Sequence, residues 1–266
     1  KEFTLLRSAV YTSGPLTEGY YAIGDMTETE LIPKEIERGI SVIYFLSNVS
    51  VLTSADNRTV VCYGDSITAQ DWPEYLTLRC NREEKLHTSV IRRAASGTRM
   101  LREYNCITYE SYGLMGKKRF QHEVPTDGAD TVIIQHGIND IIHPVGTEVN
   151  PFRPMSDMPT ANELVECMKY YISESRQFGY KVYVGTLLPI EGWRTYAPFR
   201  EVVRSQFNDW IRSTDLIDGC IDFDKALADP EQPTRMLPKF DSGDHLHPSK
   251  AGYKQMADII PGEILI

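Results

Sequence analysis

The stretch Thr-Val-Val-Cys-Tyr-Gly-Asp-Ser-Ile-Thr, at residues 59–68, joins a continuous apolar run to a polar turn. Such a run is typical of a strand that is covered on both faces, as the strands of a parallel sheet are. Gly64 allows a tight turn after this strand, so the hydroxyl of Ser66 can point to the open edge of the sheet. Because Gly-Asp-Ser is also ordinary turn chemistry, a catalytic serine and a plain turn both stay open here.

The chain beyond this stretch alternates strands with amphipathic helices. Strands are predicted at residues 59–63, 89–91, 131–134, 181–184 and 220–223. Helices are predicted at residues 160–178, 197–213 and 248–260, the last with Pro248 in its first turn. This alternation predicts an α/β fold, with a mostly parallel sheet and helices on both faces. The carboxyl ends of the strands then share one edge, where ligands bind.

Residues 1–56 have a different pattern. Strands are expected at residues 2–7 and 41–46, with no helix between them, and residues 54–57 form a polar break. The length of 266 residues allows one large domain with a small addition. We therefore predict a small β-rich annex at residues 1–56 and one large α/β domain at residues 57–266.

Composition excludes some classes of protein. The net charge of −9 argues against nucleic acid and anionic membranes as partners, since both attract clustered Lys and Arg. No apolar run approaches the ~18 residues that span a bilayer. The five scattered cysteines contain no Cys-x-x-Cys pair, which disfavours structural zinc and mildly favours a reducing, cytoplasmic compartment. No signal peptide is visible, but the sequence starts at Lys1 rather than at a methionine, so a secreted protein stays an alternative. The sequence does not predict an oligomeric state.

Two further motifs follow predicted strands. Gly137-Ile138-Asn139-Asp140 comes after the strand at residues 131–134, and the Asn139 amide could donate a hydrogen bond to an oxyanion. The alternative is a turn that caps a helix. In the segment at residues 95–98, Gly97 would let a backbone N–H approach a substrate closely. Neither motif is informative alone.

The segment Asp244-His245-Leu246-His247-Pro248 precedes the last predicted helix. A catalytic base needs a carboxylate at its other ring nitrogen, and Asp244 and His247 can supply both from one loop. A solvated loop is one alternative. A metal pair of His245 and His247 is another, but no third ligand presents itself. We expect His245 to be structural or to line the pocket.

Taken together, these segments resemble the SGNH, or GDSL-type, hydrolases, including bacterial esterases and lipases. Gly-Asp-Ser matches the motif that bears the nucleophile of the family, so Ser66 is the expected nucleophile and a backbone oxyanion donor. Gly97 matches the glycine of the second block, and Asn139 matches the side-chain donor. Asp244 and His247 match the Asp-x-x-His pair that completes the triad. The lipase elbow Gly-x-Ser-x-Gly is absent, which argues against an α/β-hydrolase.

The resemblance extends from about residue 58 to residue 262. It implies a three-layer α/β/α sandwich with a flavodoxin-like, parallel five-stranded sheet, and a reaction that requires no cofactor and no metal. One position departs from the pattern, because the family usually has an Asn where this chain has Arg92. The departure could alter the support of the site or its preference for substrate charge.

The resemblance implies a serine-dependent carboxyl-ester hydrolase, but the substrate is harder to read. Trp72, Trp193 and Tyr196 follow strand ends and could form a platform for a sugar, or could be packing residues. His136, directly before the Gly-x-Asn-Asp motif, is a further candidate to bind substrate. Our first expectation is removal of acetyl or another short acyl group from a carbohydrate. A short-chain aryl or lipid esterase, a thioesterase and a non-catalytic carbohydrate-binding module remain alternatives.

Overall fold

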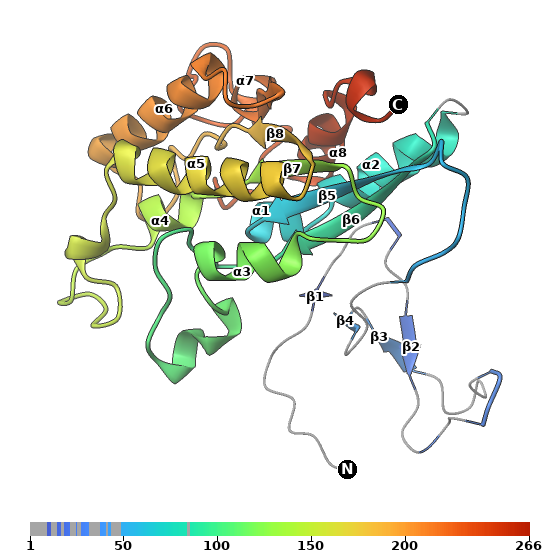
Figure 1. The fold of residues 1–266 in the computed structure, drawn as a ribbon. Helices are drawn as coiled ribbons and strands as arrows, with labels where there is room; N and C mark the ends of the chain where they lie inside the picture. The colour runs from blue at the N-terminus through green and yellow to red at the C-terminus, as the bar shows by residue number, and fades with distance from the viewer. Residues whose placement is uncertain are drawn as a thin grey trace.

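A computed structural model describes residues 10–11, 15–16, 19–21, 25, 28–31, 38–40, 42–43, 49–83 and 86–266. Its main body is a five-stranded, wholly parallel sheet with the strand order β6-β5-β7-β8-β9 (Figure 1). The strands are β5 (Arg58–Gly64), β6 (Thr88–Ala94), β7 (Thr131–Gln135), β8 (Lys181–Gly185) and β9 (Gly219–Ile221). This order is that of flavodoxin-like sheets, so the predicted fold class is confirmed.

The order of the strands also sets the position of a site. The chain passes from β5 to β6 on one side and then returns to β7 on the other side of β5. Crossovers that leave in opposite directions open a crevice beyond the carboxyl ends of these central strands. Ser66 follows β5 and the Gly137–Asp140 motif follows β7, so both lie at this switch point.

Helices cover the sheet in two groups. One group contains α3, α4, α5 and α6: α3 packs against α5, α4 packs against α6, and α5 packs against α6. The other group contains α2, α7 and α8: both α2 and α7 pack against α8. Figure 1 shows α5 in front of the sheet. The helices are α1 (Ser66–Ala69), α2 (Trp72–Arg82), α3 (Gly116–Glu123), α4 (Ile138–Ile142), α5 (Ala161–Gln177), α6 (Pro198–Ser213), α7 (Phe223–Leu227) and α8 (Lys250–Asp258). The 3₁₀ turns are η1 (Ile107–Tyr112), η2 (Met155–Asp157) and η3 (Gly262–Ile264).

The core is built on the central strands. Tyr63 of β5 has no exposed surface, and its ring packs against Phe120 of α3 and Tyr171 of α5 at centroid distances of 4.9 and 5.6 Å. Phe120 and Tyr171 stack on each other at 4.4 Å. Because side chains alternate along a strand, neighbouring residues of β5 face the opposite layer. Fully burying one large apolar side chain contributes roughly 1.5–3 kcal/mol, so this layer anchors the strand that carries the site.

Most predicted elements agree with the structure to within one residue at each end, and three differ by more: β6, which runs to Ala94 instead of ending at residue 91, α8 and β9. Helix α8 begins at Lys250, and Ser249 caps it by accepting the Gly252 N–H at 3.2 Å. The prediction that Pro248 lies in the first turn is therefore wrong; Pro248 pairs with Asp241 in an isolated bridge. Strand β9 ends at Ile221 because the next residue, an aspartate, caps α7 instead of extending the strand.

The N-terminal segment contains two small antiparallel pairs. Strand β1 (Val10–Tyr11) pairs with β4 (Val42–Ile43), and β2 (Gly19–Tyr21) pairs with β3 (Arg38–Ile40). The predicted strand at residues 41–46 contains β4, whereas the one at residues 2–7 lies outside the described residues. The Leu16 N–H donates to the Glu74 carboxylate of α2 at 2.9 Å. The division into an annex at residues 1–56 and a domain at residues 57–266 stays a prediction.

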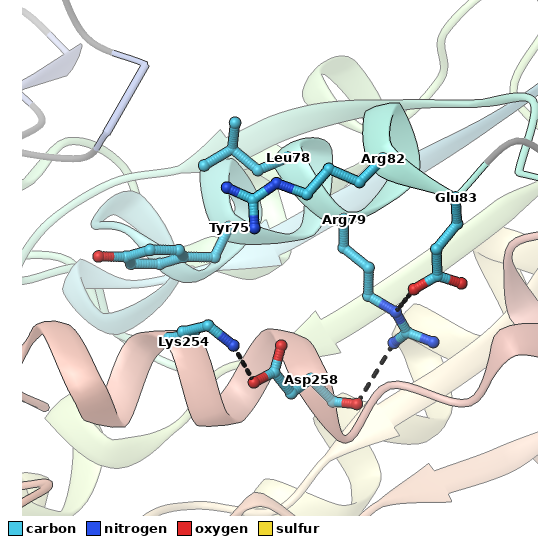
Figure 2. A pocket seen from close by; sticks show the side chains of 7 residues that line it. All are labelled: Tyr75, Leu78, Arg79, Arg82, Glu83, Lys254 and Asp258. Atoms are coloured by element: carbon cyan, nitrogen blue, oxygen red, sulfur yellow. Dashed lines mark hydrogen bonds and ion pairs between the residues drawn. The ribbon is translucent and has the colours of Figure 1, made fainter.

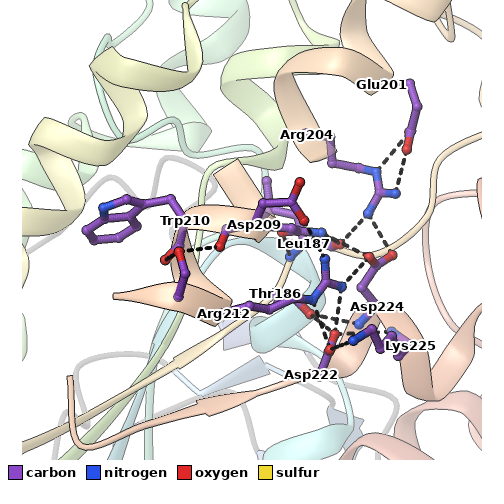
Figure 3. A network of polar contacts seen from close by, with 12 residues as sticks. Thr186, Leu187, Glu201, Arg204, Asp209, Trp210, Arg212, Asp222, Asp224 and Lys225 are labelled. Carbon is purple, nitrogen blue, oxygen red and sulfur yellow. Dashed lines mark hydrogen bonds and ion pairs between the residues drawn. The ribbon is translucent and has the colours of Figure 1, made fainter. Parts of the chain in front are cut away.

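A buried polar network fixes the end of β8 to α6 and α7 (Figure 3). Arg204 of α6 is 3% exposed and donates to the Asp224 carboxylate and to the Leu187 carbonyl oxygen, both at 2.7 Å. Arg212 donates to the other Asp224 oxygen at 2.7 Å. The network holds the start of the loop that leads from β8 to Trp193.

Among the helices that the structure describes, none has both the length and the apolar composition that a membrane span requires.

Candidate active site

Ser66 lies at the junction between β5 and the short helix α1. The turn is tight because Gly64 abuts β7: a Cβ at this position would lie 2.2 Å from the Gln135 carbonyl oxygen. Asp65 caps α1, and its Oδ1 accepts the Ile67 N–H at 3.1 Å. Ser66 is therefore the first helical residue, and first-turn N–H groups have no partner within a helix. The Ser66 N–H is thus a candidate oxyanion donor beside its own hydroxyl.

Three predicted residues form one chain of hydrogen bonds. Ser66 Oγ lies 2.9 Å from His247 Nε2, although the two residues are 181 positions apart in the sequence. His247 Nδ1 lies 2.6 Å from Asp244 Oδ2. A carboxylate on Nδ1 fixes the tautomer in which Nε2 can accept the serine proton. The arrangement can therefore raise the nucleophilicity of a hydroxyl and later return a proton to a leaving group.

The loop around Asp244 keeps this carboxylate ionised. Partial burial alone would raise the pKa of Asp244, but hydrogen bonds from the His247 ring and from the loop backbone hold the pKa well below its ordinary value. Its Oδ1 accepts the N–H groups of Leu246 and His247 at 2.9 and 2.8 Å. Hydrogen bonds to the charged form favour ionisation. Asp244 can thus stabilise an imidazolium on His247.

The predicted oxyanion donors lie on two neighbouring segments. Gly97 follows β6 with φ +78°, a left-handed conformation that favours glycine, and a Cβ there would lie 2.4 Å from the Tyr112 ring. Asn139 is in the first turn of α4, is 2% exposed, and donates from Nδ2 to the Thr98 carbonyl oxygen at 3.0 Å. The structure thus joins Asn139 directly to the segment that contains Gly97.

Asp140 strengthens the same junction, a role that sequence reasoning missed. Its two carboxylate oxygens accept the Met100 N–H at 2.7 Å and the Leu101 N–H at 3.0 Å. Burial raises the pKa of Asp140 to about 6, and these two N–H groups oppose that shift. The position of Asp140 beside Asn139 in Gly-x-Asn-Asp was the available signal. It clamps the loop after β6 onto α4.

The prediction that His136 binds substrate is wrong in this structure, because His136 has no exposed surface. Its Nε2 lies 3.3 Å from the Thr98 carbonyl oxygen and its Nδ1 lies 3.3 Å from the Tyr171 hydroxyl. Burial, with a contribution from Arg119, lowers the pKa of His136 to about 3. A neutral ring that accepts a hydrogen bond from Tyr171 can donate one to Thr98, so His136 supports the segment that contains Gly97.

The two predicted tryptophans differ in position. Trp72 is fully buried at the start of α2, its ring packs against Phe223 at 5.7 Å, and its Nε1 donates to Thr68 Oγ1 at 3.4 Å. The prediction that Trp72 contacts substrate is therefore wrong, and its packing alternative holds. Trp193 is only partly buried, and its ring stands edge-on to His247, with centroids 6.4 Å apart. Trp193 borders the candidate base.

Arg92 has a structural role. Its Nη1 donates to the Gln70 carbonyl oxygen at 3.1 Å and to Glu74 Oε1 at 3.2 Å. These contacts connect β6 to the segment between α1 and α2, close to Ser66 in the chain. Arg92 thus supports the segment that follows the nucleophile turn.

A hollow on the surface lies away from the candidate active site. A hollow of about 430 Å³ lies between α2 and α8, and none of the predicted site residues lines it (Figure 2). One cation of its lining serves the fold: Arg79 binds Glu83 at 2.9 Å and donates to the Ala257 carbonyl oxygen at 3.2 Å. Within the described part of the chain, no group of three His, Cys, Asp or Glu side chains could hold a metal ion.

Comparisons with known proteins bear on the fold and on the family. No curated protein sequence matches the chain. The fold is similar to that of the lipase/acylhydrolase from Enterococcus faecalis, at 22% identity and a TM-score of 0.57, over 78% of this chain and 95% of that one. It is also similar to Axe2, an acetylxylan esterase from Geobacillus stearothermophilus, at 19% identity and a TM-score of 0.57, over 79% and 94% of the two chains.

A third similar structure is a putative acylhydrolase from Bacteroides fragilis, at 17% identity and a TM-score of 0.54, covering 78% of this chain and 86% of that one. At these identities the solved structures support the fold. The sequence of residues 62–255 matches the model of the GDSL-like lipase/acylhydrolase family, which is well over half of the chain. The chain therefore belongs to the GDSL-like lipase/acylhydrolase family.

Proposed function

We propose that this protein is a serine-dependent carboxyl-ester hydrolase in which Ser66 is the nucleophile, His247 the base and Asp244 the residue that orients the base. The observation that carries the proposal is the continuous hydrogen-bond chain, with 2.9 Å from Ser66 Oγ to His247 Nε2 and 2.6 Å from His247 Nδ1 to Asp244 Oδ2. Membership of an acylhydrolase family supports the same reaction class.

The proposed reaction has two halves. His247 Nε2 takes the Ser66 proton while Ser66 Oγ forms a bond to the ester carbonyl carbon. The Ser66 N–H, the Gly97 N–H and the Asn139 amide stabilise the oxyanion of the tetrahedral intermediate. The C–O bond to the alcohol then breaks, and His247 gives its proton to the departing oxygen. Water repeats these steps on the acyl-enzyme and releases the carboxylic acid.

A fluorophosphonate probe tests this assignment. We expect one mass adduct on Ser66 in the wild-type protein, no adduct in Ser66→Ala, and a fall in kcat of on the order of 10⁴-fold in that variant. Ser213→Ala is a matched control, because Ser213 is exposed at the end of α6, and it should behave as the wild type. Near-full esterase activity in Ser66→Ala would contradict the proposal. Absence of labelling and of hydrolysis in the wild type would instead favour a binding module.

For the substrate, we propose acetyl or another short acyl group on a carbohydrate. The partly buried Trp193 beside His247 supports this choice, because an aromatic ring at the rim offers an apolar surface on which a sugar ring can pack. The fold similarity to an acetylxylan esterase is compatible with it. A series of aryl esters from two to eight acyl carbons, run beside acetylated oligosaccharides, separates the candidates. Preference for longer acyl chains and no cleavage of sugar acetates would favour the aryl or lipid esterase instead.

A further inference from the structure

The loop before α8 contains a second Asp–His pair that the proposed triad does not use. Asp241 Oδ2 lies 2.6 Å from His245 Nδ1, and Asp241 Oδ1 accepts the N–H groups of Gly243 and His245 at 2.8 and 3.0 Å. Asp244 binds His247 in the same way, with one oxygen on the ring and the other on the backbone. Two Asp–His pairs therefore interlock in one loop.

The backbone at His245 indicates that the imidazole itself is needed. His245 has φ +64°, and no other non-glycine residue in the described part of the chain has a positive φ. Glycine adopts this conformation without strain, whereas most residues with a Cβ are disfavoured there, asparagine and histidine less than the others. The backbone N–H bond to Asp241 would be available to glycine as well. Strained positions that persist are concentrated at functional sites, so the ring is the feature to explain.

The position of His245 is at the rim of the candidate active site. Its ring packs closely on Gly192, where a Cβ would lie 2.7 Å from His245 Cγ. The next residue, Trp193, borders the His247 ring. One loop after β8 thus touches both histidines. The His245 side chain is 50% exposed, whereas that of Asp241 is 10% exposed. The His245 ring is therefore held by a nearly buried carboxylate and is itself open to solvent.

This rim lies on the side of the site that the alcohol must occupy. In the proposed reaction, His247 Nε2 gives its proton to the departing alcohol oxygen, so the alcohol lies within reach of His247. The oxyanion donors Gly97 and Asn139 belong to other segments, which are joined to each other through Thr98. Groups that border His247 therefore contact the alcohol half of the ester rather than the acyl group.

We propose that His245 is a specificity-determining residue that binds a hydroxyl group of the alcohol half of a polyol or sugar ester; this inference rests on the proposed function. Nδ1 is bound to Asp241, which leaves Nε2 as the ring nitrogen that can exchange a hydrogen bond with a hydroxyl. Within the described residues, Nε2 has no protein partner. The exposed Arg194 lies over the Trp193 ring at 4.6 Å and adds donors to the same loop after β8. Neighbouring donors and acceptors suit adjacent hydroxyls.

The test is His245→Gly, assayed on two acetate esters. Glycine fits φ +64°, so the variant should fold with an unchanged or higher melting temperature. One substrate is a mono-acetylated methyl glycoside, which has free hydroxyls, and the other is 4-nitrophenyl acetate, which has none. Loss of one neutral hydrogen bond predicts a fall in kcat/KM of roughly 3- to 10-fold on the glycoside, mostly through KM. On the aryl ester, kcat/KM should stay within about twofold, by the same reasoning.

Two comparisons sharpen the result. Asparagine tolerates a left-handed backbone and keeps an acceptor. The kcat/KM of His245→Asn on the glycoside should therefore lie between those of the wild type and of the glycine variant. His122→Ala, at the exposed end of α3, should leave kcat/KM unchanged for both esters. Equal effects on both esters, or no effect on either, would overturn the assignment. Cleavage of the aryl ester but of no sugar acetate by the wild type would also overturn it and leave the esterase proposal standing. Cleavage of neither ester contradicts the proposed function itself.

Discussion

The side-chain amide of Asn139 donates a hydrogen bond to the carbonyl oxygen of Thr98 at 3.0 Å. This contact joins helix α4 to the segment that contains Gly97, so two predicted oxyanion donors belong to one connected unit. An asparagine amide has two N–H groups. One holds Thr98, and the other remains for an oxyanion. The same residue can therefore bind the intermediate and keep its partner donor in place.

This double role predicts a large effect of Asn139→Ala. We expect kcat to fall by roughly 10²- to 10³-fold with a smaller change in KM, because an oxyanion donor acts mainly in the transition state. Steady-state kinetics on a short-chain acetate ester measures both constants. Asn162→Ala, an exposed position on α5, is the control and should be unchanged. A loss below about threefold in kcat would remove Asn139 from the proposed oxyanion hole.

The buried ring of His136 predicts a milder effect through the same carbonyl. His136→Leu removes the donor to Thr98, which lies 3.3 Å away, and leaves a buried carbonyl with one partner fewer. Leaving a buried polar group short of partners costs about 1–3 kcal/mol, so the urea midpoint should fall and kcat should fall with it. His136→Gln can still donate and should recover part of kcat. If Gln and Leu variants have equal kcat, the ring only fills space.

Asp65 predicts a pH-dependent change in stability. Burial raises the pKa of Asp65 to about 7, opposed by the Ile67 N–H, while an unfolded aspartate titrates near about 4. Between these pH values the unfolded chain releases a proton that the folded protein keeps. The free energy of unfolding therefore falls as pH rises across this window.

Asp65→Asn keeps an oxygen for the Ile67 N–H and removes the titration. The variant should be more stable than the wild type by about 1–3 kcal/mol at about pH 8, with little gain at about pH 4. Urea unfolding at both pH values, by circular dichroism, gives the comparison. A gain that is the same at both pH values would show that the carboxyl does not titrate in this window.

The network around Asp224 predicts a strong dependence of stability on one carboxylate. Asp224→Ala would leave the 3%-exposed Arg204 with a buried charge that has lost a partner (Figure 3). Removing one partner of a buried ion pair costs about 3–5 kcal/mol when the other charge is left uncompensated; because Glu201 still binds Arg204 at 2.6 Å, we expect a loss near the lower end of that range. Asp209→Ala is a matched control, because Asp209 is 70% exposed and binds Arg212 at 3.3 Å. That exposed pair should contribute at most about 1 kcal/mol.

Denaturant unfolding of both aspartate variants gives the two free energies. Similar small losses would mean that the existing bonds from Arg204 to Glu201, at 2.9 and 2.6 Å, are enough to compensate the buried charge. Because the network also holds Leu187 at the start of the Trp193 loop, Asp224→Ala should raise KM for sugar acetates more than Asp209→Ala does.

Local patterns predicted the sheet well because strand and helix formation depend largely on periodicity that is visible in the chain. The apolar runs at residues 59–63 and 131–134 became the two central strands, β5 and β7. Helix α2 was missed because Trp72 was read as a residue at a strand end; it is the first residue of that helix and is buried. Which face of an aromatic residue is buried depends on partners such as Phe223, which are distant in sequence.

The sequence by itself determined the α/β class, the family and the candidate residues of the reaction, because short motifs carry their chemistry wherever they are placed. Only the tertiary structure decided which of these residues meet. It brings Ser66 to His247 across 181 positions, buries His136 beneath Thr98 and leaves His245 open at the rim. The physical reason is that contact and burial depend on strand order and on loop packing, and both are properties of the whole chain rather than of any segment.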